Sequence, residues 1–209
     1  MSTPYTDLVH TNLSHVTAPV AIGALNTGFL LATAKDFKND LEVLNYALTL
    51  EYLEAEFYRQ GNNADLTSGK TKKYLLAIQA DEESHVATLT ATIKKLGGTP
   101  VAPPAVDFGK AFDSRTSFLT TSHVFENKGV GAYLGAAGYI KNKAILQAAA
   151  GIFGVEARHA AIVGNLLDLH PEGGVYMGAF ETGLTKAKVL EAVAPFIVGA
   201  DKMKAAVTL

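Results

Sequence analysis

Apolar residues recur at helical spacing along four long stretches of the chain. In "DFKNDLEVLNYALTLEYLEAEFYR", residues 36–59, leucines at positions 41, 44 and 48 and then Ala55 mark one face of a helix. Further helices are predicted over residues 70–96, 114–137 and 143–169. Glycine, asparagine or proline follows each stretch, as is typical of helix ends, at positions 61–63, 97–100, 138 and 171. The pattern therefore predicts an all-α fold.

The connections between these helices differ in length. Short links join the first helix to the second and the third to the fourth, so each pair should lie antiparallel. Between the pairs runs "GGTPVAPPAVDFGKAF", which cannot be helical through Pro100, Pro103 and Pro104. Extended at about 3.3 Å per residue, this segment can cross the length of a bundle. Two hairpins joined by one long crossover predict a four-helix bundle of ferritin-like topology.

We expect this bundle to occupy residues 36–169, followed by a C-terminal extension over residues 170–209. The extension begins with the glycine-rich turn "PEGGVYMGAF" and contains one short helix around residues 185–193. This short helix is predicted to lie over an end of the bundle.

Residues 1–35 include "VTAPVAIGALNTGFLLATAKD", the most apolar part of the chain. Pro19 and several glycines interrupt it, so we expect no membrane-spanning helix. Small residues at positions 32–34 resemble an export cleavage site, but no Lys or Arg precedes Lys35. Two interpretations stay open: packing on the domain or on a neighbouring subunit, and a weak export signal. The sequence does not decide the localisation.

Composition narrows the chemistry. The 209 residues carry a formal net charge of −2, which gives no reason to expect nucleic acid as a partner. There is no cysteine, so disulfides, thiolate metal sites and cysteine nucleophiles are excluded. Any metal must be held by carboxylates and imidazoles, a donor set that suits iron, manganese or zinc.

A Glu-x-x-His motif occurs in two of the predicted helices. Glu82 and His85 form it in the second helix, and Glu156 and His159 repeat it in the fourth. Residues three apart on a helix share a face, so each motif can present a carboxylate and an imidazole to one site.

The first and third helices carry a matching repeat. Glu51 precedes Tyr58 by seven residues, nearly two helical turns, and Glu126 precedes Tyr133 by the same interval. Each member of the second pair lies 75 residues after its counterpart in the first. Little else matches between the two halves, which is expected of a pseudo-twofold site rather than of ordinary packing.

We therefore predict a dinuclear metal centre with two iron or manganese ions. Four carboxylates offset the mutual repulsion of two divalent ions, and one imidazole per ion adds a directional ligand. One glutamate from each of two helices plus Glu-x-x-His from each of the other two is a ligand set of dinuclear carboxylate bundles. The predicted ligands are Glu51 and His85 on one ion, Glu126 and His159 on the other, and Glu82 and Glu156 bridging both. Which terminal glutamate accompanies which histidine stays open.

Neighbouring residues are predicted to support these ligands unequally. Asp81 can accept a hydrogen bond from a metal-bound histidine across the bundle, whereas its counterpart Val155 cannot. Tyr58 and Tyr133 are the candidate catalytic side chains, either as hydrogen-bond donors to ligand carboxylates or as redox-active groups. Tyrosines that only fill the core are the alternative.

Three further polar residues lie close to the predicted ligands in sequence. Glu54 and Glu56 are expected to be solvated surface residues. Glu54 lies one turn from Glu51 and could replace it, but its counterpart in the repeat is Gly129, so symmetry favours Glu51. His123 is either an accessory ligand or a polar residue near the site.

Several segments resemble a known family. They are "LNYALTLEYLEAEFYRQG", "ADEESHVATLTATIKKLGG", the Glu126 and "EARH" segments, and the tail "FETGLTKAKVLEAVAPFI". Over residues 36–200 the chain resembles the ferritin-like superfamily, and more narrowly the ferritin-like domain proteins grouped with desiccation-related proteins and a fungal stress protein. The resemblance implies a dinuclear metal site, oxidant-handling chemistry and a link to stress or desiccation. The proline-rich crossover and long tail depart from cage-forming ferritins, so we expect no cage.

Two functions follow, and whether the protein is an enzyme stays open. The first is a dinuclear oxidase or peroxidase-like protein that takes dioxygen or hydrogen peroxide, with a manganese-catalase-like protein as the nearest variant. The second is a non-enzymatic protein whose metals hold the bundle together during assembly or drying. In the second, the two terminal segments would join copies of the chain into a homo-oligomer.

Overall fold

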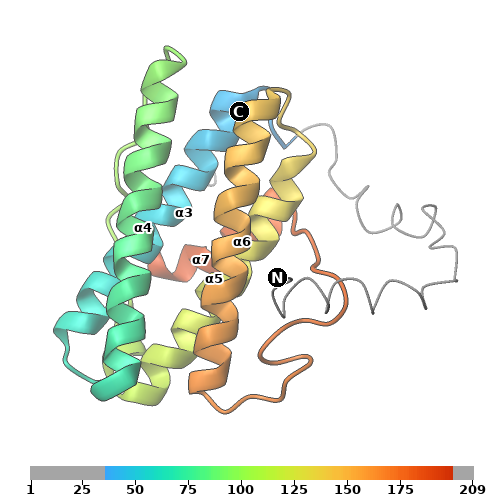
Figure 1. Cartoon of the computed structure of the whole chain (residues 1–209). Coiled ribbons are helices and arrows are strands. Elements are labelled where there is room, and N and C mark those ends of the chain that lie inside the picture. The colour runs from blue at the N-terminus through green and yellow to red at the C-terminus, as the bar shows by residue number, and fades with distance from the viewer. Residues whose placement is uncertain (1–35, 200–209) are drawn as a thin grey trace, which may run out of the picture. The chain divides into compact units, whose positions relative to one another are not determined.

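The computed structural model describes residues 36–199, and these form an all-α fold. Its four long helices, shown in Figure 1, are α3 (Asp40–Asn63), α4 (Gly69–Lys95), α5 (Arg115–Ala137) and α6 (Lys143–Leu166). The predicted four-helix bundle is therefore confirmed. Within the described part of the chain, no helix has the length and apolar character needed to cross a membrane. The predicted segment 1–35, including its export motif, lies outside the described residues.

Side-chain caps mark where α3 and α6 begin. Asn39 has an extended backbone, with φ of −159°, and its side chain accepts a hydrogen bond from the Glu42 backbone N–H at 3.0 Å. Asn142 accepts in the same way from the Ala144 N–H at 2.9 Å. Each cap satisfies an N–H group that the first turn leaves without a helical partner. For this reason α3 begins at Asp40, a few residues later than the apolar spacing suggests.

The end of α3 differs from the prediction. Gly61 was expected to stop the helix, but α3 continues to Asn63. Gly61 is buried within the helix, and a Cβ atom there would lie 2.2 Å from the ring of Phe118. The glycine therefore serves close packing of α5 on α3. The chain leaves the helix afterwards, at Asp65, whose φ is 54°.

The long crossover between α4 and α5 contains the short 3-10 helix η2 (Gly109–Phe112). It pairs with the C-terminal extension: the Asp107 N–H donates to the Phe196 carbonyl at 3.0 Å, and Val106 forms an isolated antiparallel bridge with Ile197. The extension thus holds the crossover in place, a contact that joins segments far apart in the sequence.

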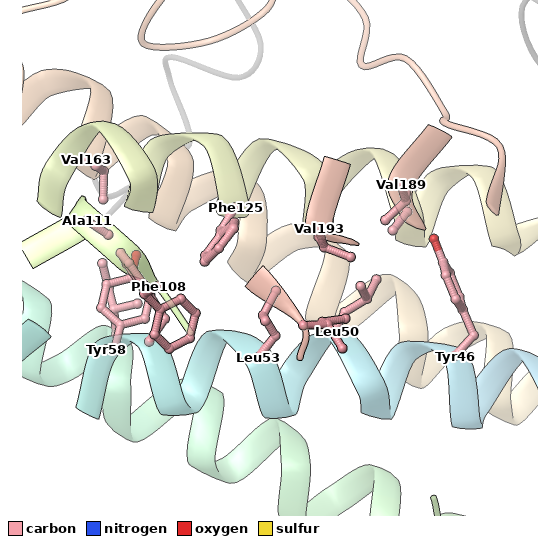
Figure 2. Close-up of a cluster of buried hydrophobic side chains, with 14 of the residues drawn as sticks. Tyr46, Leu50, Leu53, Tyr58, Phe108, Ala111, Phe125, Val163, Val189 and Val193 are labelled. Carbon is pink, nitrogen blue, oxygen red and sulfur yellow. The ribbon is translucent and has the colours of Figure 1, made fainter. Parts of the chain in front are cut away.

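The predicted C-terminal helix is present as α7 (Lys186–Val193). Its position differs from the prediction. Val189 and Val193, four residues apart on one face of α7, are buried in one cluster with Leu50 and Leu53 of α3 (Figure 2). Since these leucines lie in the middle of α3, α7 covers the side of the bundle rather than its end.

Two clusters of buried apolar side chains build the core. On α4, Leu75 and Ile78 belong to the larger cluster, while Leu89 and Ile93 belong to the smaller one. Glu82 lies between these two pairs on the same helix and is fully buried. A buried polar layer therefore lies between the two apolar clusters, near the middle of α4.

Candidate metal centre

The six side chains predicted as ligands meet inside the bundle. One glutamate comes from α3 and one from α5, and a Glu-x-x-His pair comes from each of α4 and α6. They form two groups, in each of which one ligand atom per residue lies within 4.8 Å of the others. The groups are Glu51, Glu82, His85 and Glu156, and Glu82, Glu126, Glu156 and His159. Glu82 and Glu156 belong to both groups, which is the position that bridging ligands occupy.

His85 points one ring nitrogen at the carboxylates. Its Nδ1 lies 3.2 Å from Oε2 of Glu51 and 3.2 Å from Oε2 of Glu82. The same nitrogen lies 3.3 Å from Oε1 of Glu156. The imidazole therefore presents a single donor atom to three carboxylate groups, as a metal-binding histidine does.

His159 uses its two ring nitrogens differently. Nδ1 faces the cluster, 2.9 Å from Oε1 of Glu82 and 3.4 Å from Oε2 of Glu126. Nε2 faces Asp81 Oδ2 across the bundle at 3.1 Å. A carboxylate on Nε2 orients the ring and fixes its tautomer, so that Nδ1 is left free to bind a metal. Among the described residues no such partner is recorded for Nε2 of His85, so the two halves of the centre are unequal.

Several polar atoms in the cluster lack hydrogen bonds although they are buried. All four glutamates have 0% exposure. The atoms that make no well-directed hydrogen bond are Oε1 of Glu82, Oε2 of Glu126, Oε1 and Oε2 of Glu156, and Nδ1 of His159, although some of them lie close together, such as Nδ1 of His159 and Oε1 of Glu82 at 2.9 Å. Buried polar groups left unpaired are costly, and a cluster of carboxylates also repels itself. Two divalent cations would satisfy these atoms and offset their charge, so the donor set fits a dinuclear metal site.

Two buried tyrosines cross the bundle to hold the terminal glutamates. The Tyr58 hydroxyl on α3 donates a hydrogen bond to Oε1 of Glu126 on α5 at 2.5 Å. Reciprocally, the Tyr133 hydroxyl on α5 donates to Oε1 of Glu51 on α3. Burial raises the pKa of both phenols well above the usual value, which keeps them protonated and able to donate. The tyrosines therefore orient two carboxylates that are predicted as ligands, and their redox role stays a prediction.

Comparison with known proteins agrees with this geometry. Residues 39–169 match the family model described as ferritin-like domain. The chain belongs to this ferritin-like domain family. Among solved structures it is similar to a crystal structure titled as ferritin like, diiron-carboxylate proteins from Bacillus anthracis str. Ames, with a TM-score of 0.51 and 25% identity. That match covers 61% of this chain and 94% of the other. No curated protein sequence matches this ferritin-like protein.

Burial and charge determine where protons sit in the metal-free form of this ferritin-like protein. Burial raises the pKa of Glu51 to about 8, and it raises the pKa of Glu156 well above the usual value. Burial alone would lower the pKa of His85, but the carboxylates of Glu156, Glu51 and Glu82, which accept hydrogen bonds from the protonated ring, outweigh it and raise the pKa to about 12. Protons therefore balance the carboxylate charge without metal, and metal binding must displace them.

Glu54 was expected to be a solvated surface residue, and the structure contradicts this expectation. Its exposure is only 3%, and burial together with the charges of neighbouring glutamates raises its pKa well above the usual value. Its counterpart in the repeat, Gly129, leaves room for the Glu54 carboxylate. A Cβ on Gly129 would lie 2.8 Å from Oε2 of Glu156 and 3.4 Å from Oε1 of Glu54. A fifth carboxylate thus lies beside the cluster. The sequence feature that could have indicated a buried Glu54 is the small Gly129 at the matching position of the repeat.

Two other polar residues lie apart from the cluster. His123 Nε2 makes a 2.9 Å hydrogen bond with the Gly174 carbonyl, so this histidine contacts the C-terminal extension instead. Glu56 is partly exposed and pairs with Arg59, whose Nε donates to it at 2.6 Å. The prediction of a surface position holds for Glu56.

Proposed function

We propose that this ferritin-like protein binds two metal ions, iron or manganese, and uses them in oxidation chemistry with dioxygen or hydrogen peroxide. The observation that carries the proposal is the pair of ligand groups sharing Glu82 and Glu156, buried and with unpaired atoms on both residues. The similar Bacillus anthracis structure, titled diiron-carboxylate, supports it.

Each group of residues has a role in this proposal. Bound ions would supply open coordination positions and electrons for the oxidant. Glu82 and Glu156, which belong to both ligand groups, would hold both ions, while Glu51 and Glu126 would each complete one side. The two imidazoles offer Nδ1 as the donor atom. Because the four carboxylates are fully buried, their charge would interact strongly with the charge of bound ions.

Tyr58 and Tyr133 are the candidate catalytic side chains. Each phenol donates a hydrogen bond to a carboxylate in the ligand set. If the oxidised metal centre took one electron from the phenol, the phenol proton would pass to that carboxylate, and the tyrosine would act as a redox-active group. Replacing Tyr133 by Phe should then change the products or rate of oxidation while metal content stays the same.

The first test is elemental analysis of protein purified without added metal or chelator. We expect about two equivalents of iron or manganese per chain. The Glu82→Gln/Glu156→Gln variant, which keeps the side-chain volume but removes both bridging charges, should lose them. Glu83→Ala is the matched control, because Glu83 is exposed on the same helix and outside the cluster. Equal metal content in parent and double variant would contradict the proposed ligands.

Activity is tested separately with each metal. Anaerobic protein loaded with ferrous iron should consume dioxygen on mixing, and manganese-loaded protein is assayed for decomposition of hydrogen peroxide. The double variant serves as the blank. An absence of both reactions in metal-replete parent protein would exclude the oxidase and peroxide-handling functions.

A second candidate is a non-enzymatic role in which the metals stabilise the bundle of a protective, self-associating protein. The complete burial of all four glutamates favours it, since enclosed ligands suit a structural ion. This candidate predicts metal-replete protein that reacts with neither dioxygen nor peroxide.

The proposed link to oxidative or desiccation stress rests on the tail "FETGLTKAKVLEAVAPFI" and on the α3 sequence, which resemble the desiccation-related group. It is tested by deleting the gene and measuring survival after drying and after peroxide exposure. Survival equal to that of the parent strain in both conditions would remove the link.

A further inference from the structure

An apolar cavity of about 80 Å³ lies among the four long helices next to the candidate metal centre, and the exposed residues Thr88 and Ala148 in its wall place its opening at the surface. Its wall includes Ala47, Leu89 and Ile152. Each of these lies four residues, one helical turn, from a ligand: before Glu51, after His85 and before Glu156 respectively. The cavity and the centre are therefore adjacent layers of the same bundle.

Tyr133 is shared by both layers. Its side chain lines the cavity, while its hydroxyl donates a hydrogen bond to Glu51. A molecule in the cavity would thus touch a side chain that contacts a predicted ligand directly.

Comparison of the two halves of the internal repeat shows why the cavity lies beside Tyr133 and is not repeated beside Tyr58. Ala132 and Ala149 line the cavity, and the repeat places Phe57 and Leu75 at the matching positions beside Tyr58. Phe57 and Leu75 have 0% exposure. Small side chains at the Tyr133 end thus stand where large ones fill the Tyr58 end.

Aromatic rings fill the Tyr58 end tightly. The Phe57 ring centroid lies 5.3 Å from that of Phe118 and 4.9 Å from that of Phe125. The same Phe118 ring packs so closely on α3 that Gly61 cannot carry a side chain without movement. Part of this aromatic group is visible around Phe108 and Phe125 in Figure 2. Access by a small molecule is therefore easier from the Tyr133 end.

The residues that line the cavity favour the binding of small apolar molecules. Aliphatic side chains make up most of it, and threonine and tyrosine contribute its few polar groups. A hydrogen-bonding molecule such as hydrogen peroxide would lose its bonds to water on entry, at a cost of a few kcal/mol per unpaired group. An apolar diatomic molecule loses none. An apolar cavity of about 150 Å³ in another protein takes up apolar guests such as xenon, and a space of about 80 Å³ is large enough for a diatomic molecule.

We propose that this cavity binds dioxygen and brings it to the Tyr133 side of the centre, which makes dioxygen rather than peroxide the oxidant delivered from the protein interior. The delivery rests on the proposed function of the centre. The binding of dioxygen does not, because the cavity lining contains none of the predicted metal ligands.

Binding is tested on the metal-free protein by the paramagnetic effect of dissolved dioxygen on methyl NMR signals. The repeat supplies an internal control: Ile152 lines the cavity, and Ile78 is its counterpart beside Tyr58, with both side chains buried. We expect the relaxation of Ile152 methyls to be enhanced at least about threefold more than that of Ile78. Equal enhancement at the two isoleucines would overturn the proposal.

A cavity-filling variant distinguishes relaxation by dioxygen bound in the cavity from relaxation by dioxygen in the surrounding solvent. Ala149→Leu introduces the side chain found at the matching position 75 and should abolish the excess enhancement at Ile152. Ala150→Leu, on the exposed side of the next position in α6, is the control and should leave it intact. An excess that persists in Ala149→Leu would contradict binding in this cavity.

Delivery is then measured with ferrous-loaded protein. Ala149→Leu should slow dioxygen uptake about tenfold at unchanged metal content, and oxidation by added hydrogen peroxide should keep its rate. An uptake rate equal to that of the Ala150→Leu control would overturn delivery. If the parent protein held no metal, the proposed function would fail, while the NMR comparison would still decide whether the cavity binds dioxygen.

Discussion

Individual side chains in the centre carry protons that a metal must replace. Burial raises the pKa of Glu51 from 4.5 to about 8, and carboxylate partners, against the effect of burial, raise that of His85 from 6.5 to about 12. A group with a raised pKa holds its proton in the folded state, so the stability it contributes is present at low pH. For Glu51 that stability is lost between pH 4.5 and about 8, and for His85 from pH 6.5 upward.

We therefore expect metal-free protein to unfold more easily at pH 8 than at pH 5. The difference should exceed about 1.4 kcal/mol, the free energy of one pKa unit. Chemical denaturation at the two pH values measures it. Metal binding requires deprotonated ligands, so the stabilisation by added metal should increase over the same range. A metal-free protein that is more stable at pH 8 would contradict these protonation states.

A second residue-scale prediction concerns Gly129. The Cβ of Gly129→Ala would lie 2.8 Å from Oε2 of Glu156, at the flexible end of that side chain. The carboxylate can move away at little cost in stability, but it would leave the bridging position. We expect metal affinity to fall by about tenfold or more, measured by calorimetric titration, with little change in melting temperature. Gly151→Ala on α6, with no atom within 4 Å, should bind metal as the parent does.

Among the elements, α5 and the C-terminal extension meet through their backbones. The Leu184 N–H donates to the Gly131 carbonyl at 2.8 Å, and a Cβ on Gly135 would lie 1.9 Å from the Leu184 carbonyl oxygen. Because this oxygen belongs to the backbone, no change of rotamer can relieve the clash. The approach of the extension therefore depends on glycine at this position of α5.

Gly135→Ala should lower the free energy of unfolding by about 2 kcal/mol and expose the extension to proteases near Leu184. Gly138→Ala is the control at the end of the same helix, where nothing lies within 4 Å. Thermal unfolding and limited proteolysis measure the two effects. Equal protease resistance of the two variants would show that the extension does not depend on this contact.

For the whole molecule, the buried carboxylate layer links metal content to folding. A ligand at 100 times its dissociation constant adds about 2.7 kcal/mol of stability. We expect chelation to lower the melting temperature of the parent sharply. The Glu82→Gln/Glu156→Gln variant should melt at the same temperature with and without chelator, since it is expected to hold no metal that a chelator could remove. A parent protein insensitive to chelation, despite measured metal, would show that the ions contribute nothing to the fold.

Most of the architecture could be predicted because it is encoded locally. Apolar spacing and end signals predicted all four long helices, and the lengths of the links predicted their connectivity. The convergence of the candidate ligands could be predicted for another reason: the glutamates, histidines and tyrosines repeat between the halves, and a pseudo-twofold axis brings repeated residues together. Convergence of the six predicted ligands followed from the helix pairing.

The sequence by itself determined the helices, their order and the repeat, because these depend on residues near one another or on a shared spacing. Only the tertiary structure decided the burial of Glu54, the place of α7 along α3 and the role of Gly61. It also decided that the Tyr133 end of the centre holds a cavity. Each of these depends on the volume of side chains from segments far apart in the chain, and spacing along one helix carries no record of what packs against it.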